Sequence, residues 1–490
     1  MDQRQLLPHE TTALLDTAAL LDTAALALSA KEQQCLASYI RKCDRRLMFY
    51  LCMGYAADSL NKMALSNAKV AGLSDALGLE GTDIGWALGA YYLGCFVCQL
   101  PSNLVLKKTR PVYWLSGSML CWSLATMLTA LVGSARQLVW CRFLFGAVQA
   151  GYLTGSLYYI SFWYPRSMVR RRMGLFFASA GLGGIVVGPL CAALASVRVG
   201  QLQPWQAIFL AVGALSLLWS LAGPCVLEDY PDTARFLSAD ERRVARRVME
   251  HQDTVASGQQ IRPAQVAMAL ADPKVWLWTA IDFCANAATQ VNGMFGPSII
   301  ASQGFSPQAA QALTALTNFM AFAGMASIAY AARALGGSST AIAASNCLTV
   351  CGFVLALFSA SPPWRMCALF VFSFASPQPA AHGPAWEMAN LRGNTKPAMA
   401  AAITSAFGGL GPLATAFVYR DQDSPTYVLG HSVCLTMTVL CLAATLVLRT
   451  VLARENKRRD SCGQHIDISG LSGEQRQDLA DNHPDFRYRL

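Results

Sequence analysis

The stretch 55-YAADSLNKMALSNAK-69 places charged residues inside a segment that otherwise reads as a membrane-spanning helix. Apolar residues precede it in 47-LMFYLCMGYAA-57 and follow it in 70-VAGL-73. A charge at the centre of a spanning helix costs on the order of 3 kcal/mol on insertion scales, and such residues usually face a polar interior. Asp58 and Lys62 are therefore expected to face the inside of a helix bundle, where they either mark a pathway or lock the helices together.

The whole chain is apolar, with 54% hydrophobic and 14% charged residues among 490, whereas about 25% charged residues are usual in soluble domains. A helix needs roughly 20 mostly apolar residues to cross a bilayer core of about 30 Å. Twelve windows meet this need: 46–71, 84–106, 111–133, 137–164, 173–197, 205–227, 274–300, 309–334, 339–360, 364–390, 396–420 and 427–453. The predicted fold is an all-α membrane protein with twelve transmembrane helices arranged as two six-helix bundles.

The windows divide the chain into two halves of nearly equal length around a polar middle. The predicted domains are an N-terminal tail (1–45), a first bundle (46–227), a central loop (228–273), a second bundle (274–453) and a C-terminal tail (454–490). In the central loop Ser238 and Glu241 match a capping box, so a helix is expected to start there. Its basic face suits either the anionic inner leaflet of a membrane or simple solvation.

The net charge of +9 is interpreted as membrane topology and not as binding to nucleic acid. Short cytoplasmic loops carry an excess of Lys and Arg, and here the basic clusters precede the first window and fall in every second loop. Both termini and the central loop are therefore expected in the cytoplasm. We expect a multi-pass integral protein of the plasma membrane, in contact with membrane lipids and monomeric.

Enzyme and metal signatures are absent from the sequence. It contains no GxxxxGK[ST], HExxH or GxSxG motif, so ATP-driven pumping and the corresponding hydrolases have no visible machinery. Most of the 16 cysteines lie within apolar windows, where they are expected to pack as small residues and not to form disulfides or metal sites. No cofactor and no metal are expected, and secondary transport is the leading functional class.

Polar residues recur along four of the predicted helices. Asp58 and Lys62 are four residues apart, which allows an ion pair on one helix face. The other candidates are Arg142 and Gln149 on the fourth helix, Asp282, Asn286 and Gln290 on the seventh, and Gln378 and His382 on the tenth. The tenth helix should be broken by Pro377, Pro379 and Pro384, and interrupted helices are good indicators of a binding site. Arg142 could instead extend to the interface, and Asp282 or His382 could serve interhelical packing.

Several short segments, in this order and spacing, resemble the major facilitator superfamily, and within it the fungal allantoate permease branch of the anion:cation symporters. They are 67-NAKVAGL-73, 101-PSNLVLKKTRP-111, 142-RFLFG-146, 162-FWYP-165, 393-GNTK-396, 430-GHS-432, 454-RENKRRD-460 and 483-HPDFRY-488. The resemblance implies two bundles that alternate access to a central site. It also implies proton-driven uptake of a small organic anion such as nicotinate, pantothenate or allantoate.

This chain departs from the family pattern at positions that bear on mechanism. Asn61 stands where the family has Asp, Lys62 where it has Arg, and Gln149 where it has the Glu expected to carry protons. Lys62 and Arg142 keep two positive charges for a carboxylate. Because Asn61 and Gln149 cannot titrate, proton coupling would have to use another acid, and Asp58 and Asp282 are the candidates.

The predicted substrate-binding residues are Lys62, Asn61, Arg142, Gln149, Asn286, Gln290, Gln378 and His382. The predicted function is secondary active transport of a small carboxylate, with protons as a second partner. Two alternatives remain open, namely export of a small metabolite and a nutrient receptor with a transporter fold. The pair 188-GP-189 faintly resembles the antiporter branch of the superfamily and would suit export.

Overall fold

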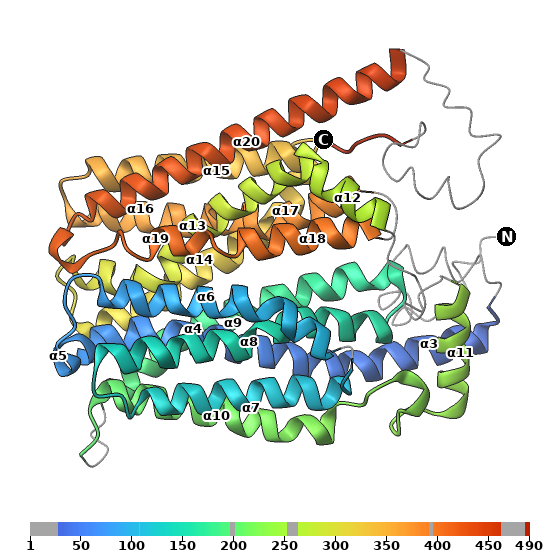
Figure 1. The fold of residues 1–490 in the computed structure, drawn as a ribbon, viewed down its shortest axis with the longest axis horizontal. Helices are drawn as coiled ribbons and strands as arrows, with labels where there is room; N and C mark the ends of the chain where they lie inside the picture. The colour runs from blue at the N-terminus through green and yellow to red at the C-terminus, as the bar shows by residue number, and fades with distance from the viewer. Residues whose placement is uncertain (1–27, 107, 197–200, 252–262, 392–394, 462–485) are drawn as a thin grey trace.

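The computed structural model describes residues 28–106, 108–196, 201–251, 263–391, 395–461 and 486–490 (Figure 1). Within these ranges all regular structure is helical. Parts of the predicted tails, central loop and the 393-GNTK-396 motif lie outside them. The six spans of the first half include α4 (Phe49–Ala68), α6 (Asp83–Leu106), α7 (Pro111–Thr129), α8 (Ala135–Trp163), α9 (Arg166–Ser196) and α10 (Pro204–Val226).

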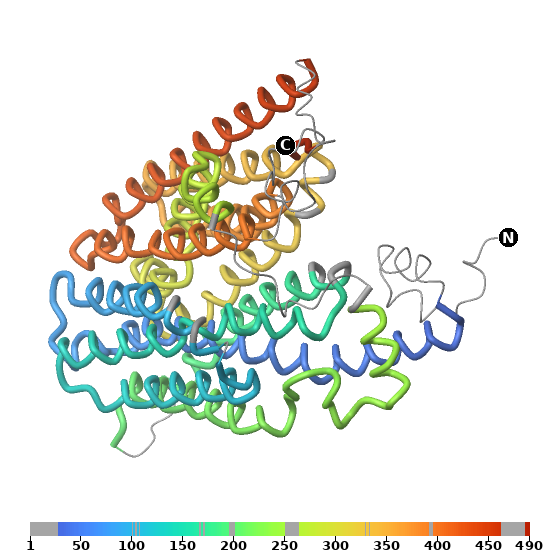
Figure 2. The backbone as a smooth tube through the Cα atoms, turned by 45° about the vertical axis from the view of Figure 1, so that its right-hand side comes forward, coloured from blue at the N-terminus to red at the C-terminus, as the bar shows by residue number. Residues whose placement is uncertain are grey.

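The second half repeats this plan with two interrupted spans. Its helices are α13 (Pro273–Ala301), α14 (Pro307–Ala334), α15 (Ser338–Phe358), α16 (Pro362–Ala375) with α17 (Pro377–Ala389), α18 (Thr395–Gly408) with α19 (Gly411–Thr415), and α20 (Val428–Ser461). The predicted twelve spans in two groups of six are therefore confirmed in the part of the chain that the structure describes. The two groups form separate layers of helices in Figures 1 and 2.

Helix starts follow local sequence signals. Ser134 and Ser306 accept a hydrogen bond from a main-chain N–H of the first turn of α8 and α14, which satisfies a group that the helix itself leaves free. Proline occupies the first position of α7, α10, α13, α14 and α16, where its missing N–H removes nothing from the helix. These local signals therefore mark where α7, α8, α10, α13, α14 and α16 begin.

The first span begins earlier than predicted. A continuous helix runs from α3 (Ala30–Cys43) through two π-helical turns, η2 (Asp44–Met48) and η3 (Lys69–Leu73), that flank α4. Ser29 and Glu32 cap its start reciprocally, so residues predicted as tail are helical. The helix ends beside Gly72, whose φ of 100° suits glycine, and is followed by α5 (Ser74–Leu77).

The tenth span is broken once, between α16 and α17. Pro377 follows the break at Ser376, whereas Pro384 stays inside α17, so the three prolines do not each interrupt the helix. The Ser376 carbonyl, at the N-cap of α17, accepts a hydrogen bond from the Thr289 hydroxyl of α13 at 2.9 Å. This bond ties the break in the tenth span to the neighbouring helix.

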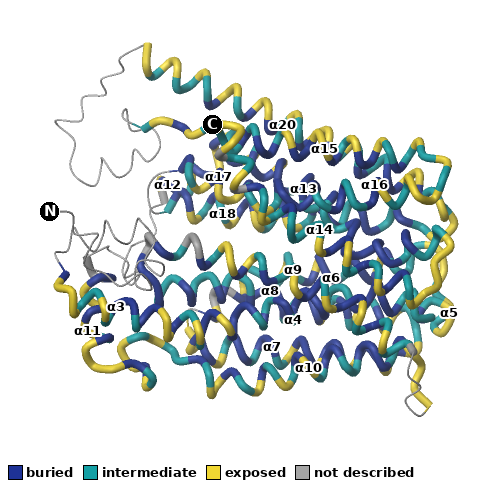
Figure 3. Tube along the Cα trace, turned by 180° about the vertical axis from the view of Figure 1, so that it is seen from behind, coloured by how far each residue is buried: buried dark blue, intermediate teal, exposed yellow. Residues whose placement is uncertain are grey.

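Buried residues line the inner sides of the helices and exposed residues their outer sides (Figure 3). Large side chains such as Phe358 (83% exposed) and Leu218 (67%) point outward, as expected of a surface that faces lipid. Six helices pass a combined length and hydropathy test for crossing a membrane among the described residues. Helices α4, α8 and α13, which carry the buried polar residues, are not among those six, and neither are α6 and α7.

Glycines in 181-GLGGIVVGP-189 bring the two halves together. A Cβ at Gly188 of α9 would lie 2.1 Å from the main-chain oxygen of Gln311 of α14. The Gly184 carbonyl accepts a hydrogen bond from the Asn318 side chain of α14 at 2.8 Å. Close backbone approach through small residues is a usual way to pack membrane helices, and it accounts for Gly188 without reference to export.

The central loop docks on the first helix. It contains η4 (Pro231–Thr233), α11 (Ala239–His251) and α12 (Pro263–Ala271). The predicted capping box is present, with Ser238 N–H donating to Glu241 at 2.8 Å. Glu241 also accepts hydrogen bonds from Lys42 (2.8 Å) and Ser38 (2.7 Å) of α3, so this acid joins two helices as well as capping one.

The basic face of α11 binds carboxylates of the protein itself. Arg246 pairs with Asp232 at 2.6 Å and Arg247 pairs with Glu32 at 2.9 Å. Arg243, by contrast, is 78% exposed and pairs only with Asp240 one turn away. The face predicted for lipid or solvent is therefore partly used to hold the central loop against α3.

We expect Glu241→Gln to loosen the docking of α11 on α3 in a pH-dependent way. Burial raises the pKa of Glu241, but hydrogen bonds from Lys42, Ser38 and the Ser238 main chain outweigh it and leave the pKa below 4.5. Because the pKa of Glu241 is lower in the folded than in the unfolded protein, its ionised carboxylate stabilises the fold at pH values above the unfolded-state pKa. This stabilisation is lost as the pH falls through the folded-state pKa. At pH 7 amide hydrogen exchange in 38–43 should be roughly tenfold faster in the variant, since hydrogen bonds to charged groups contribute about 1.5–3 kcal/mol.

The difference between variant and natural protein should shrink below pH 4.5, the usual pKa from which Glu241 is lowered. Asp240→Asn, a change at the exposed neighbouring acid, is the matched control and should leave exchange in 38–43 unchanged. Equal exchange in both variants at pH 7 would contradict a docking role for Glu241.

Candidate functional site

A buried ion pair on α4 joins Asp58 to Lys62. Lys62 Nζ lies 2.7 Å from Asp58 Oδ2, and the side chains are 25% and 1% exposed. Lys62 Nζ also lies 5.9 Å from the centre of the Tyr55 ring. Because residues four apart share a helix face, this contact follows directly from the sequence. Removing one partner would leave the other charge uncompensated, which typically costs about 3–5 kcal/mol.

Side chains from α6 and α8 surround the ion pair. Gln149 interacts with the Asp58 carboxylate. Gln149 Oε1 also accepts hydrogen bonds from the Tyr91 hydroxyl at 2.9 Å and the Cys95 thiol at 3.4 Å. The structure therefore brings together three predicted site residues, Asp58, Lys62 and Gln149. Tyr91 was not predicted, and its position in an apolar window offered no signal.

Asn61 lies on a different face of α4 from the ion pair. Its amide nitrogen donates to the Ser216 hydroxyl of α10 at 2.6 Å and to the Ala57 carbonyl at 2.7 Å. Asn61 is fully buried. The amide thus ties α4 to α10 within the first half, and the structure does not bring it to Lys62.

Arg142 is a buried cation that pairs with no carboxylate among the described residues. The residue is 3% exposed, and no described residue offers a hydrogen bond to its Nε or Nη2. Its guanidinium carbon lies 5.7 Å from the centre of the Phe145 ring and 5.2 Å from that of Phe209 in α10. The side chain therefore does not extend to the interface. Aromatic faces compensate a cation only partly, so a desolvated positive charge remains near the start of α8.

In the second half, Asp282 and Asn286 form a pair on α13. Asn286 Nδ2 donates to Asp282 Oδ2 at 3.0 Å and to the Asp282 carbonyl at 2.9 Å. Asp282 is 9% exposed. The predicted helical stripe is thus present, but its first two members bind each other.

Glu387 of α17 is a second buried acid beside Asp282, and it was not predicted. It is 1% exposed and accepts a hydrogen bond from Thr404 of α18 at 2.9 Å. A Cβ at Gly408, one turn further along α18, would lie 2.1 Å from Asp282 Oδ2. Both carboxyl groups therefore lie against one face of α18, and no Lys or Arg of the described chain compensates either. A signal existed, because Asp282 and Glu387 are the only acids in the apolar windows up to residue 390 of this half.

The remaining predicted residues are dispersed. Gln378 is 5% exposed and donates to the Phe374 carbonyl at 3.2 Å, one turn earlier in the chain. His382 is half-buried and lies 3.1 Å from the Ser338 hydroxyl at the start of α15. Gln290 is half-buried on α13. The structure does not bring these three to the Asp58–Lys62 pair.

The two halves meet firmly at the end that carries α5. There the Ser66 hydroxyl donates to the Gly293 carbonyl at 3.0 Å, and Gln311 Nε2 donates to the Asn67 carbonyl at 3.0 Å. In both bonds the donor and acceptor come from opposite halves and are buried. Each bond would have to break for this end to open.

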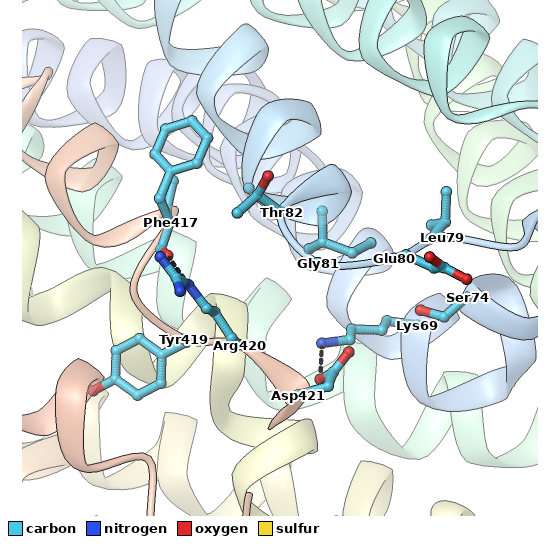
Figure 4. Close-up of a pocket in the computed structure, with 13 residues that line it drawn as sticks. Lys69, Ser74, Leu79, Glu80, Gly81, Thr82, Phe417, Tyr419, Arg420 and Asp421 are labelled. Carbon is cyan, nitrogen blue, oxygen red and sulfur yellow. Dashed lines mark hydrogen bonds and ion pairs between the residues drawn. The ribbon is translucent and has the colours of Figure 1, made fainter. Parts of the chain in front are cut away.

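A pocket at the same end lies between the halves (Figure 4). Its walls include Lys69, Glu80 and Thr82 from the first half and Tyr419 and Asp421 from the second. Lys69 forms an ion pair with Asp421 across the junction. Charged contacts thus add to the buried hydrogen bonds that close the α5 end.

The layers diverge towards the opposite end, where α3, α11 and α12 lie (Figure 2). The two groups of helices are thus joined by side-chain contacts at the α5 end, and their backbones spread apart towards the other end. A family model for the Major Facilitator Superfamily matches residues 51–417. The chain belongs to this superfamily.

The relatives of this Major Facilitator Superfamily member are transporters. It is 26% identical to the Uncharacterized transporter C11D3.18C of Schizosaccharomyces pombe over 446 residues, which cover 89% of this chain and 86% of the relative. It is 27% identical to the "Putative tartrate transporter" of Agrobacterium vitis over 288 residues, 58% of this chain and 65% of the relative. A crystal structure of a D-xylose-proton symporter superposes with a TM-score of 0.66, at 12% identity over 84% of this chain and 97% of that one.

These findings confirm the class predicted from sequence. The protein is a multi-pass integral membrane transporter with the major facilitator fold, and it is not an enzyme. The superfamily moves small molecules, so the buried polar residues belong to a protein that needs an internal site.

We expect Arg142→Met to stabilise the protein. The substitution keeps side-chain length and removes a buried charge that has no counter-ion, and replacing buried charges by apolar groups often gains about 1 kcal/mol or more. The midpoint of thermal unfolding in detergent should rise by about 2 °C. Lys62→Met is the contrasting variant and should lower the midpoint, because it leaves Asp58 unpaired. A lower midpoint in Arg142→Met would show that Arg142 has a stabilising partner.

Proposed function

We propose that this transporter carries a small organic anion, a carboxylate, by alternating access between its two halves. The observation that carries the proposal is the buried guanidinium of Arg142, which has no counter-ion among the described residues. A desolvated cation is costly, and an anionic substrate would compensate it. The name of the Agrobacterium relative, which refers to tartrate, supports a carboxylate, as does the resemblance to carriers of nicotinate, pantothenate and allantoate.

The charges of the first half suit a single carboxylate. Asp58 contributes one negative charge, and Lys62 and Arg142 contribute two positive charges, so the group carries one net positive charge. Lys62 is paired with Asp58, which avoids a second uncompensated cation. An entering carboxylate can share Lys62 with Asp58 and accept hydrogen bonds from an amide such as Gln149.

Access to Arg142 changes in this proposal with the state of the α5 end. Arg142 lies two turns from the start of α8, and Phe209 lies just over one turn from the start of α10. Both helix starts belong to the end closed by Lys69–Asp421 and Gln311–Asn67. Opening this end would let water and an anion reach the guanidinium. From the excess of Lys and Arg in alternate loops we infer that the α5 end faces outside and both termini face the cytoplasm. We propose import across the plasma membrane as the direction of transport.

The proton in this proposal is held by the second half. Asn61 and Gln149 are amides, and they bind Ser216 and Tyr91. Asp282 and Glu387 are two buried carboxyls that lie against α18, and no Lys or Arg in the described part of the chain pairs with either. Burial in a low-dielectric bundle disfavours two charged carboxylates side by side, so in this proposal the pair holds at least one proton.

The groups that face this carboxyl pair are neutral. Asn286 contacts Asp282 and Thr404 contacts Glu387. The thiol of Cys441 in α20 is close enough to Asp282 to interact with it. None of these supplies a positive charge, so release of the proton needs water to reach the pair. A conformational change that opens the second half to one side would provide that access.

Lys62→Ala and Arg142→Ala are each expected to reduce uptake to background, about 100-fold or more, because a carboxylate would lose a charged partner. The measurement is accumulation of labelled carboxylates, including tartrate, nicotinate, pantothenate and allantoate, in cells that express the protein. Arg243→Ala removes an exposed cation on α11 and should leave uptake unchanged.

The double variant Asp58→Asn with Lys62→Gln separates folding from transport. It removes the ion pair without leaving a single buried charge, so its abundance in the membrane should match the natural protein while uptake stays at background. Normal uptake in both single alanine variants would refute the anion site. Labelled carboxylate leaving preloaded cells, without uptake under any gradient, would identify an exporter instead.

Glu387→Gln is expected to abolish the acceleration of uptake by external acid. Because the amide cannot bind or release a proton, uptake should become independent of external pH between about 5 and 8, while exchange of internal for external substrate persists. Asp58→Asn is the comparison. Because Asp282 and Glu387 are unchanged in this variant, its remaining uptake should still be faster at acidic external pH. A pH profile that survives Glu387→Gln and Asp282→Asn would place the proton elsewhere.

A further inference from the structure

The segment 486–490 lies against the α11 end of the second half, where the letter C stands in Figure 1. It belongs to the 483-HPDFRY-488 motif, which the transport proposal does not use. Its contacts reach four helices, α13, α15, α17 and α20. Tyr488 is 4% exposed, although the segment follows a helix that ends outside the bundle.

Two asparagine side chains bind the backbone of this segment. Asn456 of α20 donates to the Tyr488 carbonyl and accepts from the Tyr488 N–H, both at 2.8 Å. Asn390, at the end of α17, donates to the Arg489 carbonyl at 3.0 Å and accepts from the Arg489 N–H at 2.6 Å. Each amide therefore pairs with both polar groups of one residue, as a neighbouring strand would.

Two further donors bind the backbone of this segment, and together with Asn390 and Asn456 they form what we call the slot. Trp386 Nε1 of α17 donates to the Arg489 carbonyl at 2.8 Å. The N–H of Ser338, the first residue of α15, donates to the main-chain oxygen of Leu490 at 3.2 Å. The backbone of 488–490 is thus recognised by side chains and a helix start that lie far apart in the sequence.

The Tyr488 side chain is held between two cations. Its hydroxyl accepts hydrogen bonds from Lys274 Nζ at 2.6 Å and Arg459 Nη2 at 3.3 Å. The same two groups lie 4.6 Å and 4.8 Å from the centre of its ring. Arg459 also donates to the Phe486 carbonyl at 2.9 Å. In contrast, the Arg487 side chain is 42% exposed and pairs with exposed Asp460.

These contacts matter most for α17. The break at Ser376 separates α17 from α16, so the helical hydrogen bonds that would fix its direction are interrupted there. Its position must therefore come from neighbouring groups. Trp386 and Asn390, which bind the segment, lie on either side of Glu387 in the chain.

We propose that residues 486–490 act as an intramolecular strap that holds the end of α17, and with it Glu387, against α13, α15 and α20. The occupant of the slot is this segment of the same chain. Tyr488, Asn456, Trp386 and Asn390 are positioning residues. The structural part of this proposal does not depend on the substrate, so it can be tested even if the anion proposal fails.

Amide hydrogen exchange of the full chain in detergent micelles tests the strap. Tyr488→Ala removes the ring and hydroxyl contacts, and exchange in 386–390 should become about tenfold faster. Arg487→Ala changes the neighbouring residue of the same segment, whose side chain points outward, and should leave this exchange unchanged. Tyr488→Phe keeps the ring between the two cations and should give an intermediate rate.

Asn456→Ala is a second variant that should weaken the strap, because it removes the α20 side chain that binds the Tyr488 backbone. Equal exchange of 386–390 in Tyr488→Ala, Asn456→Ala and Arg487→Ala would overturn the strap. The pH profile of uptake distinguishes a purely structural role of the strap from a role in positioning Glu387. If the strap positions Glu387, the midpoint of this profile should shift in Tyr488→Ala and not in Arg487→Ala. Faster exchange with an unchanged midpoint would overturn the positioning of Glu387.

Discussion

Charge compensation inside a low-dielectric bundle is the constraint on which this structure depends. Asp58 and Lys62 satisfy it together, because each would be costly alone and their spacing on α4 lets them meet. The pair lets a spanning helix carry two charges without reaching lipid. It also determines where a further charge can enter, since an anion near Lys62 must compete with Asp58.

The two halves handle buried charge in opposite ways. The first half holds an excess cation, Arg142, between aromatic rings. The second half holds two carboxyls, Asp282 and Glu387, among amide and hydroxyl groups. In the proposed function an anion compensates the first arrangement and a proton the second. On that proposal the carrier needs no acid at positions 61 and 149, where the family that its sequence resembles has them.

Closure at the α5 end and the strap at the α11 end act on different elements. Hydrogen bonds and the Lys69–Asp421 pair join the halves at one end. At the other end, residues 486–490 join helices within the second half only. If both proposals hold, opening the α5 end separates the two halves while residues 486–490 keep α17 in place. The broken tenth span makes such a tie useful, because a helix with an interrupted backbone cannot position its own second part.

Apolar windows and i, i+4 spacing determined the twelve spans, the two halves, the capped loop helix and the Asp58–Lys62 contact, because these depend on residues close together in the chain. The contacts that the sequence did not predict also have a physical explanation. Three contacts depend on how helices far apart in the sequence are rotated against each other. Asn61 contacts α10, Arg142 packs against aromatic rings and pairs with no acid of the described chain, and Glu387 lies beside Asp282. Helix rotation is set by packing of whole faces, such as the glycines of α9 against α14, and a single sequence does not specify which faces meet. The tertiary structure alone therefore decided which polar residues share a site.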